Sequence, residues 1–183
     1  MDDRFRKIDP LELEMKPFGL LMSDWLLITA GNTDSFNMMT ASWGGFGVLW
    51  SRCVCWCVVK PQRYSRLFLE REESFTLSFF DEEYRSALEL CGSRSGRELD
   101  KAAETGLTPI SGLLDRTTAF AEARMILECR KVYYQDLDPA HFLDPRAWKY
   151  YQEQDYHRMY VGELVNCLVR AQVGPSRPAR ETL

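Results

Sequence analysis

Three segments of the 183-residue chain bring small polar side chains together with basic ones, and this mixture suits the binding of a phosphate group. A phosphate monoester accepts hydrogen bonds from N–H and O–H groups and is stabilised by one or two cations. The segments are 37–43, 60–65 and 91–97, the last of which leads to Lys101. For any one segment an alternative stays open, because Ser and Thr also cap turns and helices while basic side chains are often only solvated.

A metal site is the second chemistry to consider, because Cys53, Cys55 and Cys57 alternate along one short segment. Thiolates bind zinc and iron–sulfur clusters. In a strand, however, alternate side chains lie about 6.7 Å apart, whereas the sulfurs of a zinc site must converge to about 2.3 Å from the ion. The remaining cysteines, at 91, 129 and 167, form no C-x-x-C pair. The pattern favours a buried strand of free thiols over a metal or redox site, and we expect no metal.

Other catalytic motifs find little support. The chain has two histidines, His141 and His157, so histidine-rich metal sites and most catalytic triads lack the side chains they need. The segment 92–96 comes close to the G-x-S-x-G nucleophile motif, but its central residue is Arg94. Neither the G-x-G-x-x-G pattern nor the P-loop pattern occurs. These observations argue against a serine hydrolase and against a Rossmann or P-loop nucleotide site.

Composition and charge exclude several classes of protein. Lys and Arg number 23 against 27 Asp and Glu, a formal net charge of -4, so no general positive field would hold DNA or RNA. The longest wholly apolar run, 53–59, is far shorter than the ~18 residues that a membrane-spanning helix needs. The first residues do not have the pattern of a secretory signal. We therefore expect a cytoplasmic protein without nucleic-acid or membrane partners.

Strands must position these segments, and the hydrophobic pattern predicts several of them. Short apolar runs that end at turn residues predict strands over 25–30, 36–43 and 75–80. The run 53–59 is apolar at both parities, which is typical of a strand covered on both faces. Longer alternating segments predict two further strands, over 119–132 and 159–171.

Short helices separate the predicted strands. One helix is expected after Pro61, where apolar residues recur at spacings of three and four, and another after Asp81, a good N-cap. A third is predicted over 97–105, with Gly106 in the left-handed position that follows a helix. The segment 138–155 is irregular and aromatic. Without a regular βαβ rhythm, this order predicts a mostly β protein with short helices, an antiparallel barrel or sandwich.

Five motifs in one order resemble the flavoredoxin branch of the flavin reductase family. They are 37–45, 60–65, 75–81, 91–97 with Asp100 and Lys101, and 157–163, and the resemblance covers roughly residues 20 to 171. It implies an antiparallel FMN-binding split β-barrel that forms a homodimer, with the flavin near the subunit interface. We expect one such domain over 1–173, followed by a flexible C-terminal tail over 174–183.

The resemblance assigns the polar segments to one non-covalently bound FMN. An extended strand offers N–H and C=O groups at regular intervals, so main-chain groups near Ser42 would face the polar edge of the flavin ring. Arg63 is the strongest candidate for the phosphate, since a guanidinium can donate two parallel hydrogen bonds. His157 stays open between a structural strand-end residue and a contact with flavin or nicotinamide. The implied FMN contacts are Asn37, Met39, Thr40, Ala41, Ser42, Trp43, Arg63, Tyr64, Ser65, Ser93, Arg94, Ser95, Gly96 and Lys101.

The resemblance further implies an NAD(P)H:flavin oxidoreductase, that is, a flavin reductase. Such a protein takes a hydride from NADH or NADPH onto FMN and passes electrons to free flavin or to a redox protein partner. Because the cofactor carries the difficult chemistry, we predict binding residues and name no catalytic residue. Two alternatives stay open: a flavin-binding electron carrier or sensor that does not turn over nicotinamide, and a split barrel that has lost flavin or binds another ligand such as haem.

Overall fold

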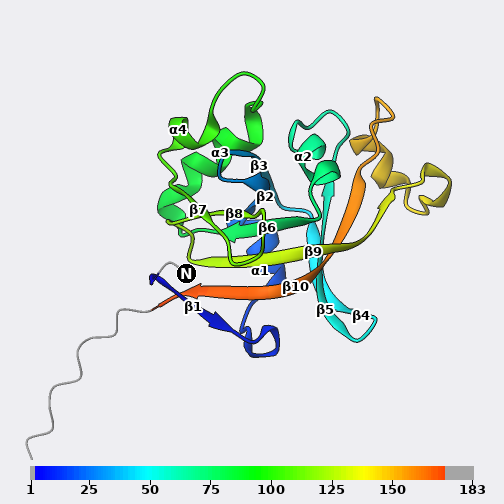
Figure 1. The fold of residues 1–183 in the computed structure, drawn as a ribbon. Coiled ribbons are helices and arrows are strands. Elements are labelled where there is room, and N and C mark those ends of the chain that lie inside the picture. The colour runs from blue at the N-terminus through cyan, green and yellow to red at the C-terminus, as the bar shows by residue number, and fades with distance from the viewer. Residues whose placement is uncertain (1–2, 172–183) are drawn as a thin grey trace, which may run out of the picture.

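An antiparallel sheet of eight strands forms the frame of the molecule in the computed structural model, which describes residues 3–171 (Figure 1). The order is β3-β2-β6-β9-β10-β5-β4, and β1 also pairs with β10. The predicted class, mostly antiparallel β with short helices, is confirmed, whereas the predicted tail over 174–183 lies outside the described residues. The strands are β1 (Phe5–Ile8), β2 (Leu26–Asn32), β3 (Ser35–Ala41), β4 (Gly44–Leu49), β5 (Arg52–Val59), β6 (Ser74–Phe79), β9 (Met125–Asp136) and β10 (Arg158–Arg170), with a separate pair of β7 (Pro109–Ser111) and β8 (Thr118–Phe120).

The sheet curls because two residues connect its two ends. Strand β3 ends at Ala41 and β4 begins at Gly44, although these strands are the first and the last in the sheet order. Consecutive Cα atoms lie about 3.8 Å apart, so the ends of the sheet must approach each other. Within residues 3–171, β3 and β4 form no ladder with each other. The result is a barrel that is open along one seam, a split barrel.

Thiols fill part of the barrel interior. Cys55, Cys57, Cys129 and Cys167 are buried there, and burial raises the pKa of the Cys57 and Cys129 thiols. All six cysteines are free. The strand predicted over 53–59 is confirmed, but it is not fully covered on both faces, because Trp56 and Val58 are partly exposed. Among the described residues, no group of three or more His, Cys, Asp or Glu side chains is arranged to hold a metal ion.

Gly162 of β10 brings two of these thiols together. Strand β10 lies between β5 and β9, yet the Sγ atoms of Cys55 and Cys129 on those outer strands are 3.3 Å apart. A Cβ atom at Gly162 would lie 2.8 Å from Cβ of Cys129 and 2.8 Å from the ring of Phe75. The glycine therefore leaves the space in which these side chains pack.

Two of the helices form a second core on the outside of the barrel, and the third packs Phe68 and Leu69 into the core of the barrel itself. Figure 1 shows α2 (Ser65–Arg71), α3 (Arg85–Ser93) and α4 (Lys101–Thr105) on one side of the sheet. Leu88 and Cys91 of α3 pack against Leu27 and Met38, which point outward from β2 and β3. On the N-terminal side lie η1 (Pro10–Glu12), α1 (Pro17–Gly19) and the π-helical turn η2 (Leu20–Asp24).

Several predicted boundaries change in the structure. The predicted strand 119–132 divides into β8 and β9, because residues 121–124 form a turn. Asp81 makes no side-chain cap; the single 3-10 turn η3 (Glu82–Tyr84) precedes α3 instead. The helix predicted over 97–105 begins only at Lys101, capped by Asp100, and Gly106 adopts the left-handed conformation as predicted, with φ 69°. Strands β1, β4 and β7 were not predicted.

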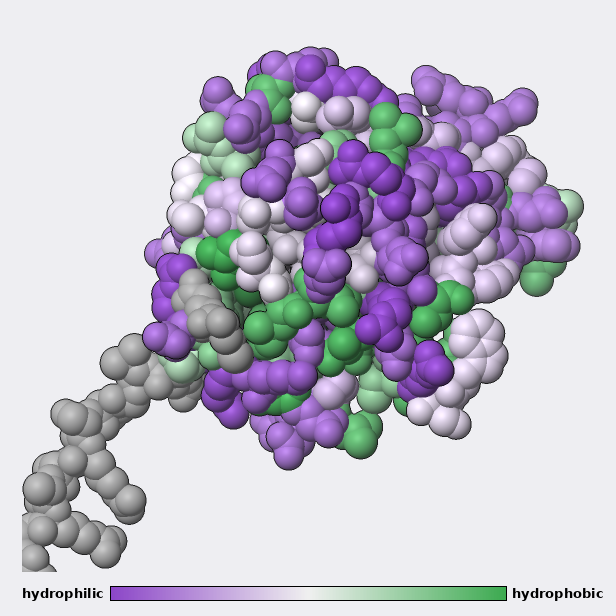
Figure 2. Space-filling view, viewed as in Figure 1, coloured by the Kyte–Doolittle hydropathy of each residue, from purple (hydrophilic) through white to green (hydrophobic). Residues whose placement is uncertain are grey.

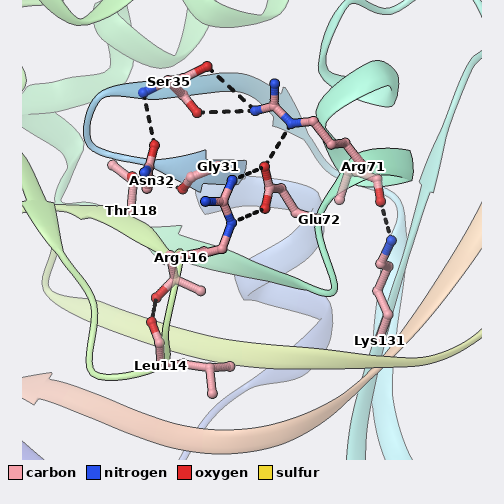
Figure 3. Close-up of polar contacts among 11 residues, drawn as sticks. Gly31, Asn32, Ser35, Arg71, Glu72, Leu114, Arg116, Thr118 and Lys131 are labelled. Atoms are coloured by element: carbon pink, nitrogen blue, oxygen red, sulfur yellow. Dashed lines mark hydrogen bonds and ion pairs between the residues drawn. The ribbon is translucent and has the colours of Figure 1, made fainter.

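A buried carboxylate links α2 to the loop between β7 and β8. Figure 3 shows Glu72 between Arg116, which donates two hydrogen bonds to it at 2.8 and 2.9 Å, and Arg71, which donates one at 2.8 Å. The hydrogen bonds from Arg116, and then those from Arg71, lower the pKa of Glu72. This ion pair fixes the loop to the end of the barrel.

A long segment joins β9 to β10. Residues 137–157 contain two short 3-10 helices, η4 (Pro139–His141) and η5 (Pro145–Tyr150), and extend beyond the barrel at the upper right of Figure 1. This agrees with the irregular, aromatic segment predicted over 138–155. Figure 2 shows a mainly hydrophilic surface on the same face, with hydrophobic residues gathered near its middle. No helix within residues 3–171 has the length and apolarity to span a membrane.

Candidate functional site

Two adjoining cavities at the seam of the barrel bring every predicted site residue together. The basic cavity, of about 340 Å³, is lined by Asn37, Met39, Lys60, Gln62, Arg63, Tyr64, Ser65, Ser93, Arg94, Ser95, Gly96 and Lys101. The aromatic cavity, of about 240 Å³, is lined by Met39, Thr40, Ala41, Ser42, Trp43, Val58, Lys60, Arg63, Tyr150 and His157. Met39, Lys60 and Arg63 line both cavities, so a single elongated ligand can contact both.

The basic cavity is strongly cationic. Four basic side chains line it, and the lining described here includes no carboxylate. A larger cavity of about 840 Å³ lies elsewhere, near η2 and the C-terminal end of β10. Its lining contains none of the predicted residues, and Arg124 there is paired with Asp24. We therefore take the basic cavity, whose donors are less fully paired, as the candidate site.

Lys101 is the most buried cation of the site. Its side chain is 6% exposed, and Nζ donates to the carbonyl oxygens of Met38 at 2.9 Å and Cys91 at 2.8 Å. An ammonium group has three N–H donors, so one is left for a ligand. Burial, and to a smaller extent nearby Arg63, lowers the pKa of Lys101. An anion in the cavity would offset this penalty on the charged lysine.

Arg63 is fixed by one of its five donors. Its Nη1 donates to the carbonyl oxygen of Gly92 at 2.7 Å, where α3 ends. The remaining N–H groups keep the planar arrangement that matches a phosphate. The neighbouring Tyr64 ring lies 4.6 Å from the guanidinium of Arg97, which covers the outer side of this turn.

Asn37, Ser65 and Gly96 form the inner wall of the basic cavity. Asn37 Nδ2 donates to Ser65 Oγ at 2.6 Å, and both side chains are buried. Because that bond uses the hydroxyl oxygen as an acceptor, the Ser65 proton is free to point elsewhere. A Cβ at Gly96 would lie 2.0 Å from Asn37 Oδ1, so only glycine fits there without moving Asn37.

The loop after α3 contributes less regular donors. Ser93 Oγ donates to the Glu89 carbonyl oxygen at 2.8 Å and is exposed, so its proton is already used. Ser95 Oγ accepts from the Arg97 amide at 3.2 Å, which leaves its own proton free. Arg94 is exposed and lies 3.8 Å from Glu98. Of the two serines, Ser95 is therefore the one whose hydroxyl proton is free to donate to a ligand.

The aromatic cavity is built at the end of β3. Thr40 Oγ1 donates to the carbonyl oxygen of Leu88 at 2.5 Å, so this predicted contact also holds α3 against the strand. Ala41, Ser42 and Trp43 follow, all at least partly exposed. Strand β3 is the first strand in the sheet order and so an edge strand, and in the described part of the chain only its β2 side carries a ladder. Main-chain groups along its other edge are therefore positioned to meet a ligand.

His157 faces this cavity from the start of β10. Its ring centre lies 5.1 Å from that of Trp43, and Nδ1 is 3.0 Å from the Tyr151 hydroxyl. Burial, followed by the positive charges of Lys60 and Arg63, lowers the pKa of His157 to about 4. The side chain has a local hydrogen-bond partner and also lines the cavity, while its contact with flavin or nicotinamide stays a prediction.

Sequence reasoning missed four residues of these linings: Lys60, Gln62, Val58 and Tyr150. Lys60 and Gln62 belong to the motif 60–65 that carries the family resemblance, so the motif itself held the signal. Tyr150 comes from the irregular segment, where no periodicity shows which aromatic ring reaches the barrel. Its ring centre lies 4.9 Å from that of Trp43.

Comparisons with known proteins identify the family and the fold of the chain. A family model described as a flavin reductase like domain matches residues 18–179. A search of curated proteins found no match. Among solved structures, an FMN-binding domain of a flavin reductase-like enzyme from Shewanella baltica is similar with a TM-score of 0.66 and 16% identity, covering 93% of this chain and 79% of that one.

Two further structures are similar at low identity. Flavoredoxin from Methanosarcina acetivorans has a TM-score of 0.64 and 20% identity, covering 91% of this chain and 76% of that one. The NADH:FAD oxidoreductase of Streptomyces globisporus, solved with NAD and FAD fragments, has a TM-score of 0.60 and 17% identity, covering 82% and 76%. These likenesses show the split-barrel fold. Since the family model spans most of the sequence, the chain belongs to the flavin reductase like domain family.

Proposed function

We propose that the protein is an FMN-binding oxidoreductase that uses NADH or NADPH. The observation that carries this proposal is the junction of a cationic cavity with an aromatic one at a free strand edge. FMN has the same two halves, a phosphate monoester and a flat ring with a polar edge. Membership of the flavin reductase like domain family supports this assignment.

The residues of the basic cavity fit the phosphate. Arg63, Lys101, Ser65 and Ser95 each keep at least one donor that no other described group uses. Charge-assisted hydrogen bonds from such cations to phosphate are among the stronger polar contacts in proteins. These residues would hold the phosphate, and the small Gly96 would let it approach the Asn37 wall.

The residues of the aromatic cavity fit the ring. Main-chain groups of Ala41, Ser42 and Trp43 would meet its polar edge, and Met39 and Val58 provide apolar surface. The low pKa of His157 keeps that side chain neutral at pH 7, so it adds no charge beside the ring. The chain thus binds and orients, and no ionised acid lines the aromatic cavity among the described residues.

FMN bound here would supply the redox chemistry, by accepting a hydride from the nicotinamide and passing electrons to free flavin or to a redox protein. The similar Streptomyces globisporus structure, an NADH:FAD oxidoreductase with NAD and FAD fragments, supports a nicotinamide donor. The carrier alternative keeps the same site and differs only in whether nicotinamide reduces the flavin.

We further propose a homodimer. Residues that alternate with the barrel-lining cysteines of β5 point outward, and Trp56 and Val58 pair there with Val161 and Met159 of β10. Trp56, Val58 and Met159 are only partly buried. Because Val58 also lines the aromatic cavity, a second copy on this face would lie beside the ring. Light scattering should give twice the 21.3 kDa of one chain; a single-chain mass would contradict the dimer.

The test of the main proposal is a visible spectrum of the protein after incubation with FMN and removal of the excess, followed by anaerobic addition of NADH and then NADPH. We expect a flavin band that stays with the protein and is bleached by one of them. A retained band that neither nucleotide bleaches would favour the carrier. If no band is retained, the flavin assignment is wrong.

A further inference from the structure

One carboxylate attaches the long segment 137–157 to the barrel beside the site. Asp155 Oδ2 accepts from Lys60 Nζ at 2.6 Å and from Gln62 Nε2 at 2.8 Å. The Asp155 side chain is 13% exposed and that of Lys60 is 26% exposed. These hydrogen bonds lower the pKa of Asp155. Asp155 itself lines neither cavity, so the binding of FMN leaves it without a role.

The same attachment places the aromatic side chains of the segment. Lys60 Nζ also donates to the Tyr150 carbonyl oxygen at 3.0 Å. The Tyr150 ring meets Trp43 edge to face, with centres 4.9 Å apart, and His157 follows Asp155 by two residues. Tyr150 and His157 thereby form one wall of the aromatic cavity, and residues of β3, which lie far from them in the sequence, also line it.

The segment has a small aromatic core of its own. The ring of Phe142 lies 5.3 Å from Trp148, 5.2 Å from Tyr151 and 5.8 Å from Tyr156. Side chains packed in this way move together, so a change at the attachment point shifts the wall as a unit.

We propose that Asp155 is a positioning residue, which holds Tyr150 and His157 so that the aromatic cavity accepts a second planar ring, the nicotinamide of NADH or NADPH. This inference rests on the proposed function. Asp155 touches neither ring, and it acts through Lys60 and Gln62. Removing it would leave Arg63, Ser65 and Lys101 of the basic cavity in place, because none of them bonds Asp155, and would loosen the wall.

The test compares Asp155→Ala, Asp155→Asn and wild type, all loaded with FMN. For Asp155→Ala we expect the KM for the preferred nicotinamide nucleotide to rise about tenfold, while kcat and the FMN dissociation constant stay within about threefold. Asp155→Asn keeps an acceptor oxygen and should recover part of the loss. Glu153→Ala is the matched control, since Glu153 is an exposed carboxylate of the same segment that lines neither cavity.

A second readout needs no ligand. Amide hydrogen exchange of residues 150–157 should be faster in Asp155→Ala than in wild type and in Glu153→Ala, because the segment is released from the barrel. Unchanged exchange together with an unchanged KM would overturn the inference. The inference would also be overturned if Asp155→Ala lost FMN and thermal stability but kept an unchanged KM at full FMN occupancy. That result is expected if Asp155 only stabilises the fold.

The two proposals fail in different ways. If wild type retains no FMN, both the proposed function and the role of Asp155 toward nicotinamide are wrong. If wild type retains FMN and is reduced, but Asp155→Ala behaves as wild type in KM and exchange, only the role of Asp155 is wrong.

Discussion

Arg63 and Asn37 contribute to the basic cavity in different ways. Arg63 presents charge and free donors, whereas Asn37 acts through the hydroxyl of Ser65. We expect Arg63→Ala to weaken FMN binding about tenfold or more, and Asn37→Ala to weaken it less. Titration of the apoprotein with FMN measures both. Arg66→Ala is the control, because Arg66 lies three residues after Arg63, lines neither cavity and is paired with Glu70. Equal FMN affinity in all variants would count against the site.

His157 should make stability depend on pH. Its pKa lies near 6.5 without burial and is lowered to about 4 in the folded protein. Above about pH 6.5 the ring is neutral in both states, but as the pH falls the unfolded state binds the proton first, so folding stability is lost between these values. Melting curves should show this loss in wild type, and His157→Gln should remove it.

NMR provides the direct check on this histidine. The chain has one other histidine, His141, whose side chain is exposed. The imidazole resonances that remain in His141→Gln therefore belong to His157. A midpoint near 6.5 for His157 would show that its ring is not buried in solution as it is in the structure.

At the residue level, sequence reasoning placed the candidate site well. Every residue implied by the resemblance lines one of the two cavities, because those residues lie in contiguous motifs at strand ends and turns. The sequence did not indicate Tyr150 and Asp155, because their positions depend on how an irregular segment folds back onto Lys60. Whether the lining residues bind FMN stays a prediction until the spectrum is measured.

At the level of elements, the hairpin of β4 and β5 carries a strained turn. Trp50 and Ser51 form its two-residue loop, with φ values of 50° and 58°. Two-residue loops of this kind favour Asn-Gly, because other residues are strained at positive φ. The double variant Trp50→Asn with Ser51→Gly should therefore raise the free energy of unfolding by about 1 kcal/mol.

Denaturant unfolding measures this effect. Trp50→Phe keeps the strain and should change little. Trp50 is 63% exposed, so its removal loses little buried surface. If the double variant is less stable than wild type, the turn is not strained. If the double variant is monomeric while Trp50→Phe is dimeric, an aromatic ring at position 50 contributes to the dimer contact.

The same hairpin shows where sequence patterns fail. Gly44 and Gly45 have the composition of a turn, and β4 was missed for that reason. In the structure the glycines are paired within the strand, and a Cβ at Gly45 would lie 2.2 Å from the Trp56 ring. Cross-strand packing, which no local pattern records, decides the conformation. The opposite error occurred at 121–124, where continued alternation hid the turn between β8 and β9.

For the whole molecule, Gly162 is the position where the barrel tolerates least added volume. Gly162→Ala would place a methyl group 2.8 Å from both Cys129 and Phe75, inside a closely packed interior. We expect the free energy of unfolding to fall by about 1–3 kcal/mol. Gly47→Ala is the control, because its methyl group would meet only Trp56, at 3.6 Å. Equal stability of the two variants, measured by denaturant unfolding, would show that the interior is looser than the structure indicates.

Because only two residues link β3 to β4, a ligand at the site can stabilise the whole barrel against opening at its seam. The aromatic cavity takes Thr40 from the first strand of the sheet order and Val58 from β5, next to the last. A molecule bound there spans the open seam and connects β3 with β5, which no ladder joins within residues 3–171. A bound ligand should therefore slow the local unfolding of the strands on both sides of the seam, including parts of them far from the cavity. Without the ligand, the barrel should begin to unfold at the seam.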